Sequence, residues 1–217
     1  MRKITVTVPG KIHLLGEHSV VHGKPALLAA IDCRLSVTIS NFKKVPLSQG
    51  VNAFHLQGVN EDTPRELGIL RKKLEAAIKR KFHLRTIPPY EIFIKSDIPI
   101  GSGLGSSAAL SAAFSGALLS FLKIPWDKNN IFDIAYNGEK FFHGNPSGGD
   151  LATVIEGGYV YFRREFEFLK SYSRLPFAIH KNIKQFYLLD TGKPVESTKE
   201  LVVNVVGKFV KDHPKKV

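Results

Sequence analysis

The feature that most constrains this chain is a glycine-rich stretch at residues 98–113, which reads IPIGSGLGSSAALSAA. Its glycines alternate with other residues, so the backbone can approach a ligand without interference from Cβ atoms. The stretch follows a predicted strand at residues 90–95 and leads into a predicted helix at residues 106–122. Because unpaired N–H groups at a helix start attract anions, the stretch predicts a phosphate-binding loop, with serine hydroxyls placed for a metal ion.

Other loops rich in glycine match this stretch less well. A Walker A loop requires a lysine that is absent here. A dinucleotide-binding fingerprint requires a further small residue where Ser106 stands, and a hydrolase elbow centred on Ser107 requires glycine where Ala109 stands. The His-Arg-Asp and Asp-Phe-Gly tripeptides of protein kinases are also absent from the sequence.

Two carboxylates stand in an unusual context within residues 138–150, GEKFFHGNPSGGD. Glu139 lies in a predicted helix, and Asp150 follows a cluster of turn residues and opens another predicted helix. Phosphoryl transfer requires a metal ligand, a group that takes the proton of the acceptor, and a cation for the developing charge. Lys11, which follows Pro9 and Gly10, is a candidate for that cation.

Composition argues against several other classes of protein. The net charge of +12 favours anionic partners, but its densest segment, residues 71–85, reads as an amphipathic helix with a solvated cationic face, and no nucleic-acid-binding module is recognisable. No apolar run approaches the ~18 residues of a membrane span. Histidines 13, 18 and 22 do not match a zinc motif. A single cysteine, Cys33, excludes an internal disulfide and fits a cytoplasmic protein.

The pattern of apolar residues predicts a mixture of strands and helices in a layered α+β or α/β domain. The amino-terminal strand is expected to end where residues 8–11 open a loop, and residues 12–24 are expected to form a loop that crosses a site. The remaining predicted strands are residues 26–40, 90–95, 159–163 and 185–190, and the predicted helices are residues 65–82, 106–122, 130–142, 147–153 and 198–210.

These residues resemble the GHMP kinases, a superfamily named for galactokinase, homoserine kinase, mevalonate kinase and phosphomevalonate kinase. The phosphate-loop segment is typical of the superfamily, and the run HGNPSG at residues 143–148 is similar to mevalonate kinases within it. The segments that carry the resemblance are residues 8–27, 98–113, 138–150 and, more weakly, 188–202.

The resemblance implies a role for each of a set of residues. Asp150 would be the catalytic base, and Lys11 would pair with it and stabilise the reacting oxygens. Ser107 and Glu139 would hold Mg²⁺, while Glu17, His18 and Thr198 would face the substrate. The nucleotide would be bound by Ser96, Gly101, Ser102, Gly103, Leu104, Gly105, Ser106 and Ser107.

The resemblance also implies the α+β GHMP kinase fold, with a two-layer amino-terminal domain similar to domain 2 of ribosomal protein S5. Residues 1–180 would form this nucleotide- and substrate-binding domain, and residues 181–217 would begin an incomplete carboxy-terminal domain. Mevalonate kinases are longer and carry a third glycine-rich motif. We therefore expect a truncated chain, or one whose other half is a separate chain.

The expected activity is ATP-dependent phosphorylation of the mevalonate hydroxyl to 5-phosphomevalonate, in isoprenoid precursor synthesis and in the cytoplasm. The expected partners are mevalonate, ATP and Mg²⁺, with no nucleic acid and no membrane, and with a homodimer or a separate carboxy-terminal chain as possible assemblies. Two alternatives remain open: another GHMP kinase, for phosphomevalonate or a sugar, and an inactive nucleotide-binding half-protein.

Overall fold

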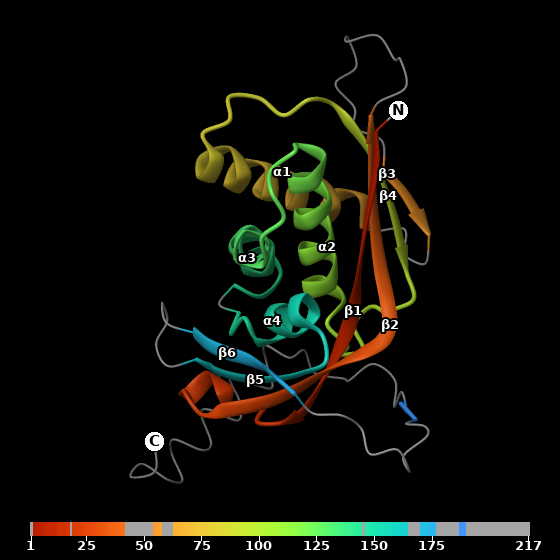
Figure 1. The fold of residues 1–217 in the computed structure, drawn as a ribbon. Coiled ribbons are helices and arrows are strands. Elements are labelled where there is room, and N and C mark those ends of the chain that lie inside the picture. Colours follow the sequence, from red (N-terminus) through yellow and green to blue (C-terminus); the bar gives the residue numbers. More distant parts are fainter. Residues whose placement is uncertain are drawn as a thin grey trace.

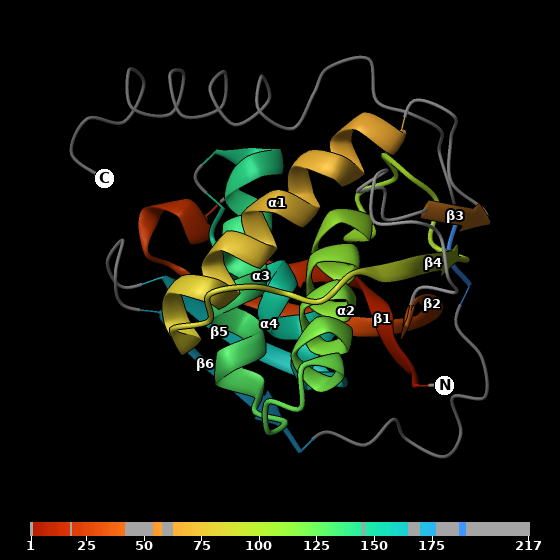
Figure 2. The same cartoon turned by 90° about the horizontal axis from the view of Figure 1, so that it is seen from above.

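The computed structural model describes residues 2–17, 19–41, 54–57, 63–144, 146–164, 170–176 and 187–189 of the 217-residue chain. These residues form a curved sheet with helices α1, α2, α3 and α4 gathered on one face, as Figures 1 and 2 show. The elements are β1 (Lys3–Leu15), the short 3-10 helix η1 (Val20–His22), β2 (Pro25–Asn41), β3 (Phe54–Gln57), α1 (Thr63–Phe82), β4 (Tyr90–Ser96), α2 (Ser106–Phe121), α3 (Lys128–His143), α4 (Gly149–Glu156), β5 (Tyr159–Arg164) and β6 (Lys170–Leu175).

Strand β2 organises the sheet. The strand order is β3-β4-β2-β5-β6, with β1 paired to β2, and only β3 and β4 pair in parallel among the described strands. Along one edge β2 pairs antiparallel with β1, and its two ends also pair with β5, through residues 25–29, and with β4, through residues 35–41. Strand β4 ends at Ser96, which pairs with Leu35 in the middle of β2. The glycine-rich loop therefore begins beside the middle of β2.

The predicted end of the first strand is wrong, because β1 continues through the expected loop to Leu15. The pairing shifts between Pro9, opposite Arg34, and Gly10, opposite Ile31, and then continues. Such an irregularity accommodates a proline, which has no N–H to give to the ladder. The consequence is that residues 11 and 13 belong to a strand, where alternate side chains share a face.

The helical layer is held to the sheet by apolar faces. In α1, Leu67, Leu70, Leu74 and Ile78 are at most 1% exposed, while its basic residues lie outside this stripe, as the sequence predicted. Helix α2 is buried along most of its length, and its many small residues let β1, β2, α3 and α4 pack closely around it. The serine hydroxyl of Ser115 in this helix donates to the Ser111 carbonyl at 2.7 Å, which satisfies a buried polar group.

Most of the expected elements are confirmed, with ends displaced by a few residues. The predicted helix at residues 198–210 and the predicted domain boundary at residue 180 lie outside the described residues. Of the predicted strand at residues 185–190, only residues 187–189 are described, and they have no regular secondary structure. None of the helices that the structure describes is both long enough and apolar enough to cross a membrane.

The crossing of α1, α2 and α3 depends on the absence of a side chain at Gly138. A Cβ atom there would lie 2.6 Å from Ser111 Oγ and 2.8 Å from Leu70 Cδ1. We expect Gly138→Ala to lower the free energy of unfolding by about 1–3 kcal/mol, as overpacked cores do. Gly68→Ala is the matched control, because a Cβ atom in that helical position meets nothing within 4 Å and should stabilise by roughly 0.5–1 kcal/mol.

Denaturant unfolding of the two variants and the parent measures both effects. Equal changes at the two positions would show that the helix crossing has room for a methyl group, contrary to the packing described.

Candidate active site

The glycine-rich loop leaves β4 and ends at the start of α2, in the arrangement that the sequence predicted. Gly101, Gly103 and Gly105 have φ angles of 78°, 74° and 77°, in the left-handed region that favours glycine. Gly105 is the N-cap residue of α2, and no side chain caps this helix. The N–H groups of its first turn are therefore available to an anion.

Two of the predicted nucleotide-binding serines have hydrogen bonds within this loop. The Ser102 hydroxyl donates to the Pro99 carbonyl at 2.8 Å. The Ser96 hydroxyl oxygen accepts from the backbone N–H of Ile98 at 3.1 Å. These contacts shape the turn that carries the chain from the sheet to α2.

Lys11 lies beneath the loop and is only 4% exposed. Its backbone N–H donates to the Leu104 carbonyl at 2.9 Å, which fastens the loop to β1. A Cβ atom at Gly105 would lie 2.8 Å from Lys11 Cγ and 3.1 Å from Lys11 Cε. The glycine therefore makes room for the lysine stem, and the loop fixes the direction of that stem.

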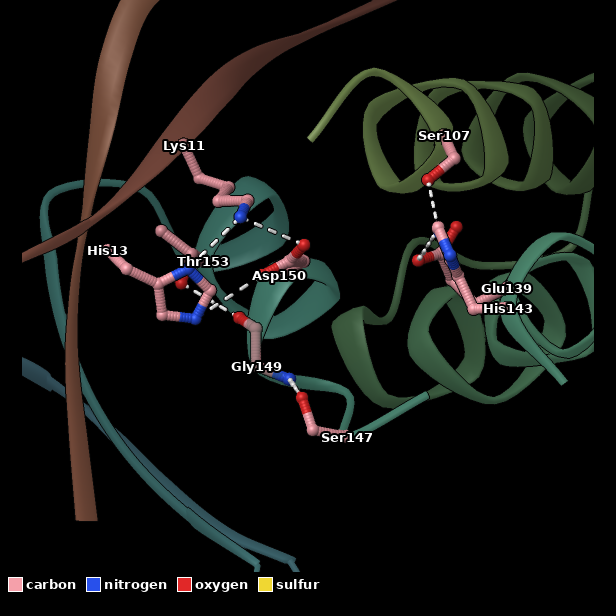
Figure 3. A network of polar contacts seen from close by, with 9 residues as sticks. All are labelled: Lys11, His13, Ser107, Glu139, His143, Ser147, Gly149, Asp150 and Thr153. Atoms are coloured by element: carbon pink, nitrogen blue, oxygen red, sulfur yellow. Dashed lines mark hydrogen bonds and ion pairs between the residues drawn. The ribbon is translucent and has the colours of Figure 1, made fainter. Parts of the chain in front are cut away.

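The Lys11 ammonium reaches a carboxylate and an imidazole (Figure 3). Lys11 Nζ lies 3.0 Å from Asp150 Oδ2 and 3.1 Å from His13 Nδ1. The other ring nitrogen, His13 Nε2, lies 3.7 Å from Asp150 Oδ1, which is beyond hydrogen-bond distance but within ion-pair range. These three side chains come from β1 and from the first turn of α4.

The backbone around Asp150 is tightly packed. Gly148, the N-cap residue of α4, has a φ of 94°, and the Gly149 N–H donates to Ser147 Oγ at 3.2 Å. A Cβ atom at Gly149 would lie 3.3 Å from the ring of Phe162, so the glycine lets the helix start approach β5 closely. The turn and the helix start therefore fix the main chain of Asp150.

A second group of side chains joins the start of α2 to the end of α3 (Figure 3). Ser107 Oγ lies 2.9 Å from His143 Nε2, and this nitrogen is 3.9 Å from Glu139 Oε2. Partial desolvation lowers the pKa of His143, whose side chain is 49% exposed, and this favours the neutral imidazole.

Glu139 is 2% exposed, and its Oε1 atom has no hydrogen-bond partner among the described residues. Burial, and to a lesser extent the negative charge of Asp150, raise the pKa of Glu139 from its ordinary value of 4.5 to about 8. The Ser107 hydroxyl and the Lys11 ammonium oppose that rise. A buried carboxyl with an unpaired oxygen is suited to a hard cation, because a cation supplies the charge and the ligand that the carboxylate lacks.

The structure brings together four of the predicted site residues from distant segments of the chain, namely Lys11, Ser107, Glu139 and Asp150. Lys11 and Asp150 lie near enough to Glu139 to act on its pKa, and Ser107 lies between the phosphate loop and Glu139. Glu17 is exposed in the turn after β1, and His18 and Thr198 lie outside the described residues.

The sequence reasoning missed His13 and His143 as members of this site. His143 follows Glu139 by four residues in a helix, a spacing that places both on one face. His13 follows Lys11 by two residues in a strand, which also places both on one face. His143 could have been found from the predicted helix. His13 could not, because the sequence wrongly predicted a loop at that position.

Comparison with known proteins identifies the family of this chain. Residues 69–158 match the family model described as the GHMP kinases N terminal domain. A mevalonate kinase from Archaeoglobus fulgidus is 36% identical over 203 residues, covering 92% of this chain and 62% of the relative. The chain belongs to the GHMP kinase superfamily. Within that superfamily, the chain is similar to mevalonate kinases of several archaea and of Mus musculus.

Solved structures confirm the α+β GHMP kinase fold. The mevalonate kinase of Methanococcus jannaschii has a TM-score of 0.74 at 22% identity, covering 98% of this chain and 68% of that one. The L. major mevalonate kinase in complex with R-mevalonate has a TM-score of 0.69 at 22% identity, covering 100% and 63%. The chain spans less than two thirds of the length of the first curated relatives it matches.

The raised pKa of Glu139 predicts a pH-dependent loss of stability without metal. Well below pH 4.5 the carboxyl is protonated whether the chain is folded or unfolded, so Glu139 does not change the free energy of unfolding there. Between pH 4.5 and about 8 the unfolded chain gives up this proton first, so the folded state is progressively disfavoured. We therefore expect Glu139→Gln to stabilise the chain in EDTA, by a margin that grows over this range to roughly 2–4 kcal/mol.

Thermal and denaturant unfolding between pH 5 and 9 would measure this gain. Glu66→Gln, at an exposed position in the first turn of α1, is the control and should show no such rise. A Glu139→Gln variant that is less stable than the parent at pH 8 would contradict the assigned environment.

Proposed function

We propose that this chain carries out ATP-dependent phosphorylation of the mevalonate hydroxyl, giving 5-phosphomevalonate for isoprenoid precursor synthesis. The observation that carries the proposal is the ion pair of 3.0 Å between Lys11 and Asp150, held beside an uncapped helix start and a glycine-rich loop. An anion site next to a carboxylate and an ammonium is the set of groups that phosphoryl transfer requires. The similarity to mevalonate kinases supports the choice of acceptor.

In this proposal Asp150 takes the proton of the acceptor hydroxyl as the new O–P bond forms. The carboxylate is one-third exposed, so an acceptor can reach it, whereas the adjoining ammonium is buried. Lys11 holds the carboxylate in place and stabilises negative charge on the reacting oxygens. The phosphates would lie on the loop and helix start formed by Gly101, Ser102, Gly103, Leu104, Gly105, Ser106 and Ser107, with Ser96 near the nucleotide.

Ser107 and Glu139 are the residues that would hold Mg²⁺. Both offer oxygen atoms, and the unpaired, buried Oε1 atom of Glu139 fits a cation that prefers hard ligands. When bound, the ion would neutralise charge on the phosphate oxygens. Glu139 must lose its proton for this purpose, so the binding of Mg²⁺ and the release of one proton are linked.

The proposal also covers the residues that face the substrate, the domain boundaries, the location and the partner chains. Glu17, His18 and Thr198 are proposed to face mevalonate, which the similar L. major enzyme contains in its structure. We also propose residues 1–180 as the nucleotide- and substrate-binding domain, residues 181–217 as the start of a second domain, a cytoplasmic location, and either a homodimer or a separate carboxy-terminal chain as partner.

The decisive experiment is an assay of the purified chain with ATP, Mg²⁺ and a panel of acceptors, namely mevalonate, phosphomevalonate, homoserine and galactose. We expect phosphate transfer to mevalonate, with 5-phosphomevalonate identified by mass spectrometry. Transfer to another acceptor alone would overturn the substrate assignment. If no acceptor is phosphorylated by the chain, alone or with a separately expressed carboxy-terminal half, the proposed activity is wrong.

Replacement of the proposed base tests its role. Asp150→Asn keeps the shape of the side chain but cannot accept a proton at neutral pH. We expect kcat to fall by about 10²–10⁴-fold, the usual contribution of a positioned acid–base group, while ATP binding measured by calorimetry changes little. Asp32→Asn is the control, because Asp32 is 87% exposed and outside the site. Turnover of Asp150→Asn at the parent rate would leave Lys11 as the leading candidate for the base.

The space beneath the loop can be tested with a pair of alanine substitutions. Gly105→Ala and Gly103→Ala both put an alanine in the left-handed region, at a cost of roughly 1–2 kcal/mol each. Only the Cβ atom at Gly105 would strike Lys11, whereas the one at Gly103 meets nothing within 4 Å. We expect kcat of Gly105→Ala to be about tenfold lower than that of Gly103→Ala, because a displaced lysine misaligns the reacting groups. Equal kcat values would show that the lysine stem adapts.

A further inference from the structure

His13 lies beside the pair formed by Lys11 and Asp150, and the proposed chemistry gives it no role. Its side chain is 13% exposed, and it points from β1 to the same side of the sheet as Lys11. A histidine in such a place can be a packing residue, a proton carrier or a positioning residue. The contacts of its two ring nitrogens distinguish these roles.

The contact with Lys11 determines which ring nitrogen carries the proton. A lysine ammonium has three N–H donors and no acceptor, so His13 Nδ1, at 3.1 Å from Nζ, must accept. The ring is then neutral, and its proton lies on Nε2. Nε2 then lies 3.7 Å from Asp150 Oδ1, whereas Lys11 Nζ is paired with Oδ2 of the same carboxylate.

The same contact restricts the ammonium. A lysine side chain is a flexible stem with a rotating head, and it points a donor in a fixed direction only when its other donors are held. One donor of Lys11 goes to Asp150 and a second goes to His13, while Gly105 leaves just enough room for the stem. Lys11 has a third N–H donor, which under the proposed function would face a reacting oxygen.

We propose that His13 is a positioning residue that orients the Lys11 ammonium and, through that ammonium, the Asp150 carboxylate. The proposal rests on the proposed kinase function for its catalytic consequence, but the orientation of Lys11 is a property of the chain itself. His13 does not touch the reacting atoms. Its removal should therefore slow turnover without weakening the binding of either substrate.

Three substitutions separate its two contacts. His13→Asn keeps an acceptor near the position of Nδ1, His13→Gln keeps a donor near that of Nε2, and His13→Leu keeps neither. We expect kcat of His13→Leu to fall by about 10- to 100-fold, the cost of misplacing a reacting group, with little change in KM. His13→Asn should recover most of the loss, and His13→Gln should recover little.

Controls distinguish positioning from packing. Lys24→Met, at an exposed position after η1, should have the parent kcat, and the melting temperatures of the His13 variants should not follow their kcat values. Parent kcat in all three variants, or a loss in all three that follows the melting temperature, would show that His13 only fills space and would overturn the proposal.

The ring proton can be observed without any assay of activity. Long-range ¹H–¹⁵N spectra of the labelled chain should show His13 with its proton on Nε2 and an accepting Nδ1. The Nδ1 signal should move in Lys11→Met and stay in place in Lys24→Met. A parent chain that phosphorylates nothing would overturn the proposed function alone. A His13 ring protonated on Nδ1, or an Nδ1 signal unchanged in Lys11→Met, would overturn this inference.

Discussion

The site depends on a lysine whose charge is buried. Lys11 is 4% exposed, and a charged group removed from water in this way is tolerated only where other groups compensate it. Its partners tie three parts of the chain together: the loop before α2 through Leu104, the start of α4 through Asp150, and β1 itself through His13. The loop, the helix start and the strand therefore cannot move independently of the lysine.

Much of this site could be predicted from the sequence because its parts are local. Alternating glycines before a helix predict an anion-binding loop whatever surrounds them, and the loop and α2 lie where the sequence places them. Glu139 and Asp150 could be identified as candidate site residues because a cluster of turn residues lies between them. The amphipathic pattern of α1 likewise predicted its buried stripe.

The errors arose where a long-range pairing decides local structure. Residues 8–15 contain a proline, a glycine and two polar side chains, so local propensity favours a loop. Pairing with β2 overrides that propensity, and the shift of register at Pro9 absorbs the proline. The proposed role of His13 could be inferred only from this pairing, because a loop assigns no face to a side chain. The unpaired oxygen of Glu139 was also beyond prediction, since it depends on how α2 and α3 pack.

Charge links the Lys11–Asp150 pair to the second group of side chains, which contains Ser107 and Glu139. Asp150 and Glu139 repel each other, and the ammonium of Lys11 opposes the rise in the pKa of Glu139. The ammonium contacts Asp150 directly, so Asp150 receives most of its compensation and the buried Glu139 keeps a proton near neutral pH. A cation beside Ser107 would supply the charge that Glu139 lacks and would displace that proton. Under the proposed function, Asp150 as the base is already paired with Lys11, whereas Glu139 would lose its proton when a cation binds.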